Sequence, residues 1–336
     1  MTAVPGTIKK LVNDPANIAA ELVAAFADAH PTIVRRVSER VLVRAERSAA
    51  KVGIVGGGGS GHEPAFLGYV GAGCIDAVAV GNVFAAPPPD AILASIEHAD
   101  RGRGVLLIYG NYSGDVMNCR LAVRKAAAAG IDVRQLFVTD DLASAPADES
   151  HRRRGIAGDV MVFKIAGAAA EAGASLDEVE AIGRSANART RTIGVALSSA
   201  ELPGAPKPIF TTGDNEMEVG LGVHGEPGIA TQKLGTADEV GTLLAERLLA
   251  DLDCPAGITV ALLVNGLGAT PLVEQYLVHG AVSRHLAASG ISVHRSMVGE
   301  FVTSLQMAGL SVTLTVLDDE LRGLLDAPVR TVAWCR

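Results

Sequence analysis

The sequence predicts an α/β protein with two α/β domains, each built on a mostly parallel or mixed sheet with flanking helices. Short apolar runs alternate along the chain with segments of helical periodicity, a pattern typical of strands joined by helices. Hydrophobic residues make up 49% of the chain and aromatic residues only 4%, which indicates an aliphatic core. The 336 residues suffice for two domains of ordinary size. We therefore expect one domain over residues 1–190 and a second over 191–336.

The helices and strands of the first domain are predicted from capping residues, helix-breaking residues and apolar runs. The first helix should begin with Asp14 as N-cap and Pro15 in its first turn, and should end near His30. Ser175 and Glu178 form a capping box that should start another helix. Strands are expected at 51–55, 77–80, 104–109 and 133–138, and further helices at 65–70, around 92–96, between 115 and 130, and up to about 173.

The second domain should repeat the α/β pattern. The stretch 215–228 has neither helical nor alternating periodicity and is predicted to be a glycine-rich loop. Strands are expected at 192–198, 258–264, 292–298 and 311–317, and a helix at 272–288. Ligands of such sheets gather beyond the carboxyl ends of the strands, so the loops that follow strands are where a site is expected.

Charge and cysteine content argue against several classes of protein. The net charge of −8 makes nucleic acid an unsuitable main partner, because phosphate neutralisation needs clustered Lys and Arg. The one basic run, 152–154, is predicted to be a solvated loop. Cys74, Cys119, Cys254 and Cys335 show no CxxC spacing, which favours free thiols in a reducing cytoplasm and no zinc site. Without a signal-peptide pattern or an apolar stretch of about 20 residues, no membrane association is expected.

The stretch 56–64, GGGGSGHEP, follows the first apolar run and is the strongest candidate for a site. A chain accepts so many glycines where its backbone turns sharply or lies against a ligand. Gly56, Gly58 and Gly61 match the dinucleotide pattern GxGxxG. However, Asp76 precedes the second apolar run instead of ending it, and His62 would stand where a pyrophosphate meets the helix. A nicotinamide-dependent oxidoreductase and a purely structural turn stay as disfavoured alternatives.

Two side chains that can carry chemistry follow predicted strands. His62 comes after the strand at 51–55 and Asp115 after the strand at 104–109, so both should lie on one edge of the sheet if these strands are near neighbours. Taken alone, Asp115 is better explained as the N-cap of its helix, and His224 as an exposed loop histidine. Three glycine-rich loops that each carry a histidine or an aspartate favour a common site.

Several motifs together resemble the dihydroxyacetone kinase family, specifically its substrate-binding K subunit. The resemblance spans essentially the whole chain, in order. The pair GGGSGHEP and HGEPG is far more specific than a lone GxGxxG. The motifs are GGGSGHEP at 57–64, GNVFAAPPPD at 81–90, NYSGD at 111–115, DNEMEVGLGVHGEPG at 214–228, NGLGATP at 265–271 and DAPV at 326–329.

The resemblance implies a mechanism with three catalytic residues. By motif position, His224 attacks the ketone carbonyl and holds the substrate as a covalent hemiaminal, which a neutral imidazole can do near pH 7. His62 would hydrogen-bond the adduct and assist its proton transfers. Asp115 would accept the proton of the terminal hydroxyl as that hydroxyl attacks phosphorus.

The resemblance also places the backbone of Gly59, Ser60 and Gly61 against the substrate, and one position departs from the family pattern. Subunits specific for dihydroxyacetone (glycerone) tend to carry Lys before the Asn of NYTGD, where this chain has Gly110. The missing side chain could leave a void for a larger keto-sugar such as erythrulose. The resemblance therefore implies a ketose kinase of glycerol metabolism, with the larger ketose as an alternative substrate.

The resemblance further implies partners outside the chain. The family's nucleotide-binding L module holds ATP or ADP with magnesium through a Gly/Asp-rich loop, and this sequence has no such cluster. We expect no cofactor or metal on this chain and a separate L-type subunit as partner. Its donor would be ATP, or ADP recharged by a phosphotransferase-system subunit. Family members are commonly homodimers, and paralogues that sense the ketose for a transcription factor provide a second functional alternative.

Overall fold

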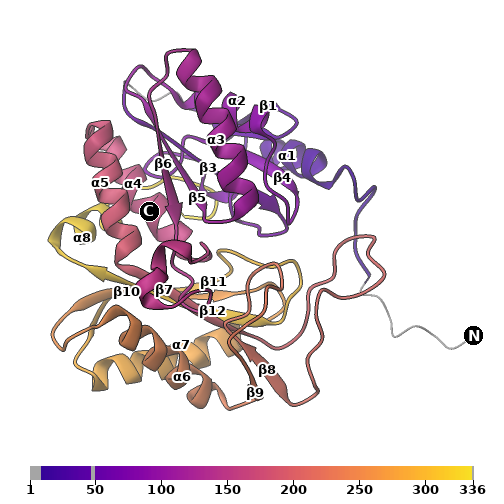
Figure 1. Cartoon of the computed structure of the whole chain (residues 1–336), viewed down its shortest axis with the longest axis vertical. Coiled ribbons are helices and arrows are strands. Elements are labelled where there is room, and N and C mark those ends of the chain that lie inside the picture. Colours follow the sequence, from indigo (N-terminus) through magenta and orange to yellow (C-terminus); the bar gives the residue numbers. More distant parts are fainter. Residues whose placement is uncertain (1–8, 47–49, 335–336) are drawn as a thin grey trace, which may run out of the picture.

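The computed structural model describes residues 9–46 and 50–334, and the first of its two sheets occupies the upper half of Figure 1. This sheet has the strand order β1-β2-β4-β3-β5-β6. Strands β4, β3, β5 and β6 run parallel to one another, whereas β1 and β2 form an antiparallel edge. The strands are β1 (Val34–Ser38), β2 (Val41–Arg44), β3 (Gly53–Ser60), β4 (Ala77–Val83), β5 (Val105–Gly110) and β6 (Val133–Val138).

Helices cover both faces of the first sheet. On one face α1 (Ile18–Ala29), α4 (Asp159–Glu171) and α5 (Leu176–Ala188) contribute to one hydrophobic core. On the other face α2 (Pro89–Ala99) and α3 (Ser113–Ala128) contribute to a separate core. Each helix buries an apolar stripe against the strands, as the alternation of strand and helix patterns predicts.

The second sheet, in the lower half of Figure 1, has the strand order β11-β10-β12-β7-β8-β9. Only β10 and β11 are parallel, so this sheet is mixed. Together the two sheets confirm the predicted fold class. The strands are β7 (Thr190–Ala196), β8 (Glu216–Val219), β9 (Ala230–Lys233), β10 (Thr259–Gly266), β11 (Ser292–Gly299) and β12 (Gly309–Leu317), and α6 (Ala237–Leu252) and α7 (Leu272–Ala288) pack on one face.

After β12 the chain returns to the core of the first sheet. Helix α8 (Asp319–Asp326) packs against α4, and Leu321, Leu325 and Trp334 belong to the same core as the strands β3 and β4. The last residues therefore stabilise the part of the molecule formed by the first half of the chain. The predicted division at residue 190 remains a prediction.

Most predicted elements are present with small shifts of their ends. The strand at 133–138 and the helix at 272–288 have the predicted bounds, and the capping box of Ser175 and Glu178 is formed. Helix α1 begins at Ile18, later than predicted, because the Asp14 carboxylate accepts the Ala16 N–H (2.9 Å) in a separate turn. Strand β8 lies within the stretch predicted as a glycine-rich loop.

The prediction of a loop at 56–61 was wrong for most of its length. Residues 56–60 continue strand β3, paired in parallel with β4. Glycine is required there by close packing, because a Cβ on Gly57 would lie 2.4 Å from Ala79 O and one on Gly58 would lie 2.1 Å from the Phe66 ring. Backbone pairing in the centre of the sheet thus outweighs the low strand propensity of glycine. The helix predicted at 65–70 is reduced to the 3₁₀ helix η1 (Leu67–Tyr69).

The basic run 152–154 is only partly a solvated surface. Arg152 is exposed, but Arg153 is 1% exposed. The Arg153 guanidinium donates to both carboxylate oxygens of Asp251 (2.7 and 2.6 Å) and to Ala145 O (2.8 Å). The planar fork of arginine matches a carboxylate in this bidentate way, which a charge count along the sequence does not reveal. Arg153 therefore ties the segment before α4 to helix α6.

Replacing Arg153 should destabilise the protein much more than replacing its neighbour Arg152. The Arg153→Ala variant should lose about 3 kcal/mol of unfolding free energy, because it leaves the Asp251 carboxylate short of a buried partner. The exposed pair of Arg152 with Glu149 should contribute about 0.5 kcal/mol or less, so Arg152→Ala is the matched control. Urea denaturation of both variants measures the difference, and equal midpoints would contradict it.

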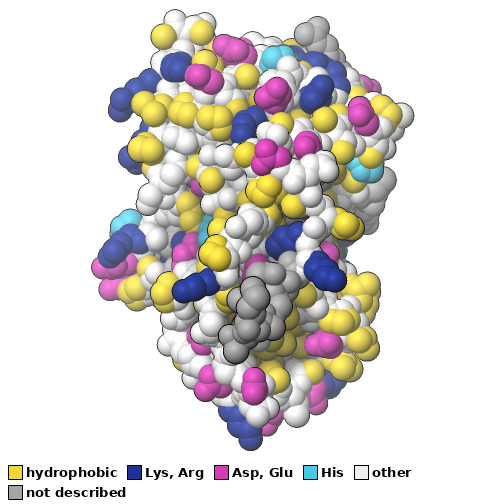
Figure 2. Space-filling model, turned by 90° about the vertical axis from the view of Figure 1, so that its right-hand side faces the viewer, with side chains coloured by type: hydrophobic (Ala, Val, Ile, Leu, Met, Phe, Trp, Pro, Cys, Tyr) yellow, Lys and Arg dark blue, Asp and Glu magenta, His cyan; other side chains and the backbone are white. Residues whose placement is uncertain are grey.

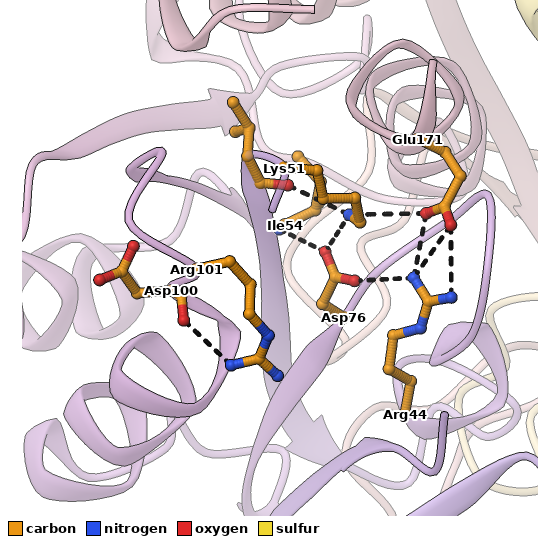
Figure 3. Close-up of polar contacts among 8 residues, drawn as sticks. Arg44, Lys51, Ile54, Asp76, Asp100, Arg101 and Glu171 are labelled. Atoms are coloured by element: carbon orange, nitrogen blue, oxygen red, sulfur yellow. Dashed lines mark hydrogen bonds and ion pairs between the residues drawn. The ribbon is translucent and has the colours of Figure 1, made fainter. Parts of the chain in front are cut away.

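A cluster of four charged side chains lies at the amino end of the central strands (Figure 3). Asp76 accepts from Lys51 Nζ (2.6 Å), from Arg44 Nη1 (3.1 Å) and from the Ile54 N–H (2.9 Å). Glu171 of α4 completes the cluster by pairing with Arg44 (3.0 Å). Asp76 is thus committed to ion pairs at the end of the sheet opposite to His62, which agrees with its exclusion as a ribose-binding residue.

The charged surface and the cysteines complete the description of the molecule. On the face shown in Figure 2, basic and acidic side chains are interspersed. In residues 9–46 and 50–334, no helix is long and apolar enough to cross a bilayer. Cys74 and Cys119 are buried free thiols and Cys254 is a partly buried one. Cys335 lies outside the described residues.

Candidate functional site

The carboxyl ends of strands β3 and β5 open into one narrow pocket. These strands are parallel neighbours, so the residues that follow them meet at one sheet edge, as predicted for His62 and Asp115. His224 reaches the same pocket from the loop after β8. The pocket is lined by Gly57, Gly58, Gly59, His62, Phe66, Gly110, Tyr112, Asp115, Gly155, Ile156, Asp159, Val223, His224 and Val302.

Two of the residues predicted to line the substrate lie outside this pocket. The Ser60 hydroxyl donates to Gly81 O (2.7 Å), and the Gly61 N–H donates to the Glu63 carboxylate (3.0 Å). Both residues line a separate hollow on the side of the N-terminal segment. Of the three residues 59–61 predicted to lie against the substrate, Gly59 lines the pocket, together with Gly57 and Gly58.

The two histidines face each other through their Nε2 atoms, which are 3.0 Å apart. His62 is 3% exposed, and its Nδ1 lies 2.7 Å from the Thr303 carbonyl oxygen, which can only accept. Nδ1 of His62 therefore carries hydrogen. Burial, and then the nearby His224, lowers the pKa of His62 to about 3. His62 is thus neutral, and its Nε2 presents a lone pair to His224.

Glu226 holds the opposite side of the His224 ring. Its carboxylate lies 3.0 Å from His224 Nδ1 and also accepts the His224 backbone N–H (3.0 Å). Burial raises the pKa of Glu226, but the hydrogen bond and charge of His224 outweigh it and lower the pKa to about 2. Glu226 is therefore an anion that fixes the direction of the imidazole.

One protonation pattern satisfies all three contacts of the histidine pair. These contacts are His62 Nδ1 with Thr303 O, His224 Nδ1 with Glu226, and the two Nε2 atoms with each other. His224 then carries hydrogen on both ring nitrogens, donating from Nδ1 to Glu226 and from Nε2 to His62. The shared proton lies between the two Nε2 atoms. If it leaves, the lone pair of His224 Nε2 is exposed to the pocket as a nucleophile.

Aromatic rings frame the histidine pair. Phe84 stacks on His62 with ring centroids 4.8 Å apart and meets His224 edge-on at 5.1 Å. Its backbone has φ of 55°, in the left-handed region that bulky residues rarely adopt. Tyr112 meets the other side of His224 at 4.9 Å. These ring contacts help to keep the imidazoles in place.

Asp115 lies inside the first turn of α3 and is not its N-cap. The N-cap is Tyr112, and Asp115 Oδ1 is buried without a hydrogen-bond partner in the part of the chain that the structure describes. Burial raises the pKa of Asp115 to about 7, against a smaller opposing effect of His224. A carboxyl that titrates near neutral pH and has a free oxygen in a pocket is suited to general base catalysis.

The structure leaves little space beside Gly110. A Cβ at this position would lie 3.1 Å from Gly155 O and 3.1 Å from the Tyr112 ring. The void inferred from the missing lysine side chain is therefore largely filled by neighbouring backbone and by an aromatic ring.

Sequence reasoning missed four residues that line the pocket or contact its histidine pair. Glu226 and Tyr112 stand within the motifs HGEPG and NYSGD that drew attention to their neighbours, so the motifs could have revealed them. Phe84 lies in GNVFAAPPPD, but its stacking on His62 depends on an unusual backbone conformation. Asp159 follows no motif or spacing that would place it in the pocket.

Comparison with known proteins places the chain in a defined family. The Dak1 domain model matches residues 24–333. A dihydroxyacetone-binding subunit DhaK of a PTS-dependent dihydroxyacetone kinase from Listeria innocua is 45% identical, covering 97% of this chain and 100% of the subunit. An L-erythrulose 1-kinase from Mycolicibacterium smegmatis is 44% identical, but the match covers 58% of that enzyme and 97% of this chain.

Solved structures agree with this placement. A dihydroxyacetone kinase operon co-activator, DhaQ, superposes with a TM-score of 0.89 at 35% identity over 94% of this chain and 98% of that chain. The dihydroxyacetone kinase of C. freundii in complex with AMP-PNP and Mg²⁺ gives a TM-score of 0.86 at 32% identity over 97% of this chain and 61% of that chain. The chain therefore belongs to the Dak1 domain family, together with the dihydroxyacetone-binding DhaK subunits.

Proposed function

We propose that the chain is the substrate-binding subunit of a dihydroxyacetone kinase, and that it holds the ketose on His224 as a covalent hemiaminal. The observation that carries this proposal is the histidine pair, in which Glu226 fixes one ring nitrogen of His224 and directs the other into the pocket. The full-length match to a DhaK subunit supports the same function.

The first step is attack of the ketone by His224. Its Nε2 proton passes to His62 Nε2, and the freed lone pair of His224 forms a bond to the carbonyl carbon while the C=O π electrons move to oxygen. His62, whose pKa is lowered to about 3, is a strong acid once protonated and gives its proton to this oxygen. The His224 ring carries the positive charge before and after this step, and Glu226 pairs with it in both states.

The second step is transfer of a phosphoryl group to a terminal hydroxyl of the bound ketose. Asp115 in its ionised form accepts the hydroxyl proton, and the oxygen attacks the phosphorus of a donor on another subunit. Dihydroxyacetone is the proposed substrate, because the corner beside Gly110 is largely filled. Erythrulose remains the alternative that the related L-erythrulose 1-kinase supports.

The donor is proposed to arrive on a separate nucleotide-binding L-type subunit, with ATP or with ADP recharged by a phosphotransferase-system subunit. The chain spans 61% of the C. freundii kinase that binds AMP-PNP and Mg²⁺, so more than a third of that enzyme has no counterpart in the match. A hollow of about 700 Å³ near Asp115 carries the basic residues Arg120, Arg124 and Arg152 beside the apolar Met117 and Leu121. These side chains suit a partner that carries phosphate groups.

The remaining expectations about assembly and place in the cell also belong to this proposal. A homodimer is expected from the family resemblance, and exposed apolar residues at the start of α7, including Val273 and Tyr276, provide a face that could join two copies. A cytoplasmic location is expected because the described cysteines are free thiols.

A reconstitution assay tests the proposed function. The chain is incubated with dihydroxyacetone and magnesium ATP, alone and with an L-type subunit, and also with the phosphotransferase-system donor. Phosphorylated ketose should form only in the mixtures that contain the L-type subunit. Formation of product by the chain alone would contradict the proposal that a separate L-type subunit carries the phosphoryl donor. Covalent capture without turnover in any mixture would favour the alternative supported by the DhaQ similarity, a ketose-sensing regulator.

A further inference from the structure

Asp159 is a buried carboxyl that the mechanism above does not use. It is the first residue of α4, is 2% exposed, and lines the pocket together with His224 and Asp115. The helix does not use it as a cap, because the N-cap position belongs to Gly158 and no side chain caps this end. Asp159 Oδ1 is buried without a hydrogen-bond partner among the described residues. A buried oxygen left in this state costs free energy unless something else satisfies it.

The neighbouring Asp140 shows what a structural carboxyl looks like in the same region. Asp140 is fully buried, and its two oxygens accept the backbone N–H groups of Ile156 (2.8 Å) and Gly158 (2.7 Å). These bonds shape the turn that leads into α4. Asp159 makes no comparable bond through Oδ1, although it lies only one residue beyond this turn. A role in holding the turn therefore explains Asp140 but not Asp159.

Helix α4 is buried along almost its whole length, so a charged residue at its first position is unusual. The helix is buried from Asp159 to Ala170, and the other charged side chain of this stretch, Lys164, donates to Leu324 O (2.6 Å). Burial, increased by Asp140 and Asp115, raises the pKa of Asp159 well above its usual range. In its protonated form, which this shift favours, one oxygen donates and the other accepts. A hydroxyl group, which also donates and accepts, is its matching partner.

Asp159 stands at the corner of the pocket where the lysine side chain of the family pattern is missing. A Cβ placed on Gly155 would lie 2.6 Å from the Gly110 Cα and 3.0 Å from Asp159 Oδ1. The glycines at 110 and 155 thus let the backbone approach Asp159 Oδ1 closely. Because Gly110, Gly155 and Asp159 line the same pocket, a ligand hydroxyl bound at this corner would face the carboxyl.

We propose that Asp159 binds a hydroxyl group of the ketose and so selects hydroxylated ketones over their deoxy analogues. The proposal rests on the proposed function, because it needs the ketose to be bound in this pocket. Asp159 would form a hydrogen bond with one hydroxyl, while Asp115 faces the hydroxyl that is phosphorylated. Both carboxyl groups would then have a hydrogen-bond partner in the complex.

The test compares two ketones that differ by one hydroxyl, dihydroxyacetone and hydroxyacetone, on the isolated chain. Dissociation constants of the covalent adducts are measured by titration with intact-mass detection, so no partner subunit is needed. The wild type should bind dihydroxyacetone about tenfold more tightly, as expected for one buried hydrogen bond. In Asp159→Ala this ratio should fall to about one, because hydroxyacetone can place its single hydroxyl at Asp115. Asp159→Asn, which keeps both a donor and an acceptor, should retain most of the ratio.

Controls separate this role from structure and from the proposed function. Asp140→Asn should lower Tm but leave the ratio unchanged. An unchanged ratio in a folded Asp159→Ala variant would overturn the role of Asp159 while leaving capture by His224 intact. If the wild type captures neither ketone, the proposed function itself fails. Should Asp159→Ala not fold, a crystal structure of the wild-type dihydroxyacetone adduct decides, because a ligand hydroxyl farther than about 3.5 Å from both Asp159 oxygens would contradict the proposal.

Discussion

The His224→Ala variant should form no covalent adduct with dihydroxyacetone, whereas the wild-type chain should gain the mass of one ketose molecule. The reason is geometric: Glu226 holds His224 Nδ1 at 3.0 Å, which leaves Nε2 as the nitrogen directed into the pocket. His62 cannot replace it, because its Nδ1 is committed to Thr303 O and burial lowers its pKa to about 3, which makes its Nε2 a weak nucleophile. Intact-mass spectrometry at saturating ketose measures the increment.

His294→Ala is the matched control for this experiment. His294 is another histidine whose ring bonds a carboxylate, Asp326 (2.8 Å), but it lies on the edge strand β11 and does not line the pocket. Its replacement should leave the mass increment unchanged. An adduct that persists in His224→Ala would assign the nucleophile to another group and remove the basis for the hemiaminal mechanism.

The fold was predictable from sequence wherever hydrophobic periodicity and end signals agreed. The helix α7 and the strand β6 combine both and were predicted to the residue. Strand β3 could not be recognised beyond Val55, because glycine has a low strand propensity and its pairing depends on β4, more than twenty residues away. Arg153 was misjudged for a similar reason, since its partner Asp251 is brought to it only by the fold.

The candidate site, like the fold, could be predicted from the sequence only in part. His62 and Asp115 could be placed at one sheet edge because they follow strands, and parallel neighbouring strands end at the same edge. His224 needed the family resemblance, because its loop has no periodicity. The role proposed for Asp159 depends on a buried carboxyl oxygen that has no hydrogen-bond partner among the described residues. No spacing along the chain can reveal such an oxygen.

The Asp115→Asn variant should keep covalent capture of the ketose and lose turnover by about 10²- to 10⁴-fold in the assembled kinase, the usual contribution of a general base. Asparagine has the shape of the carboxyl but cannot take the hydroxyl proton. Folding should not suffer, because Asp115 Oδ1 has no hydrogen-bond partner to lose within residues 9–46 and 50–334. Asp90→Asn, at an exposed carboxylate on helix α2, is the matched control and should leave turnover unchanged.

The pH dependence of turnover gives an independent readout of the same residue. Burial raises the pKa of Asp115 to about 7, so the carboxyl is protonated and inactive as a base at lower pH. Turnover of the wild-type assembly should therefore rise with pH through about 7 and level off above it, provided that the chemical step limits the rate. In Asp115→Asn the residual turnover should lose this rise. If the variant kept both full turnover and the wild-type pH profile, another group would have to accept the proton, and Asp115 would contribute only to the shape of the pocket.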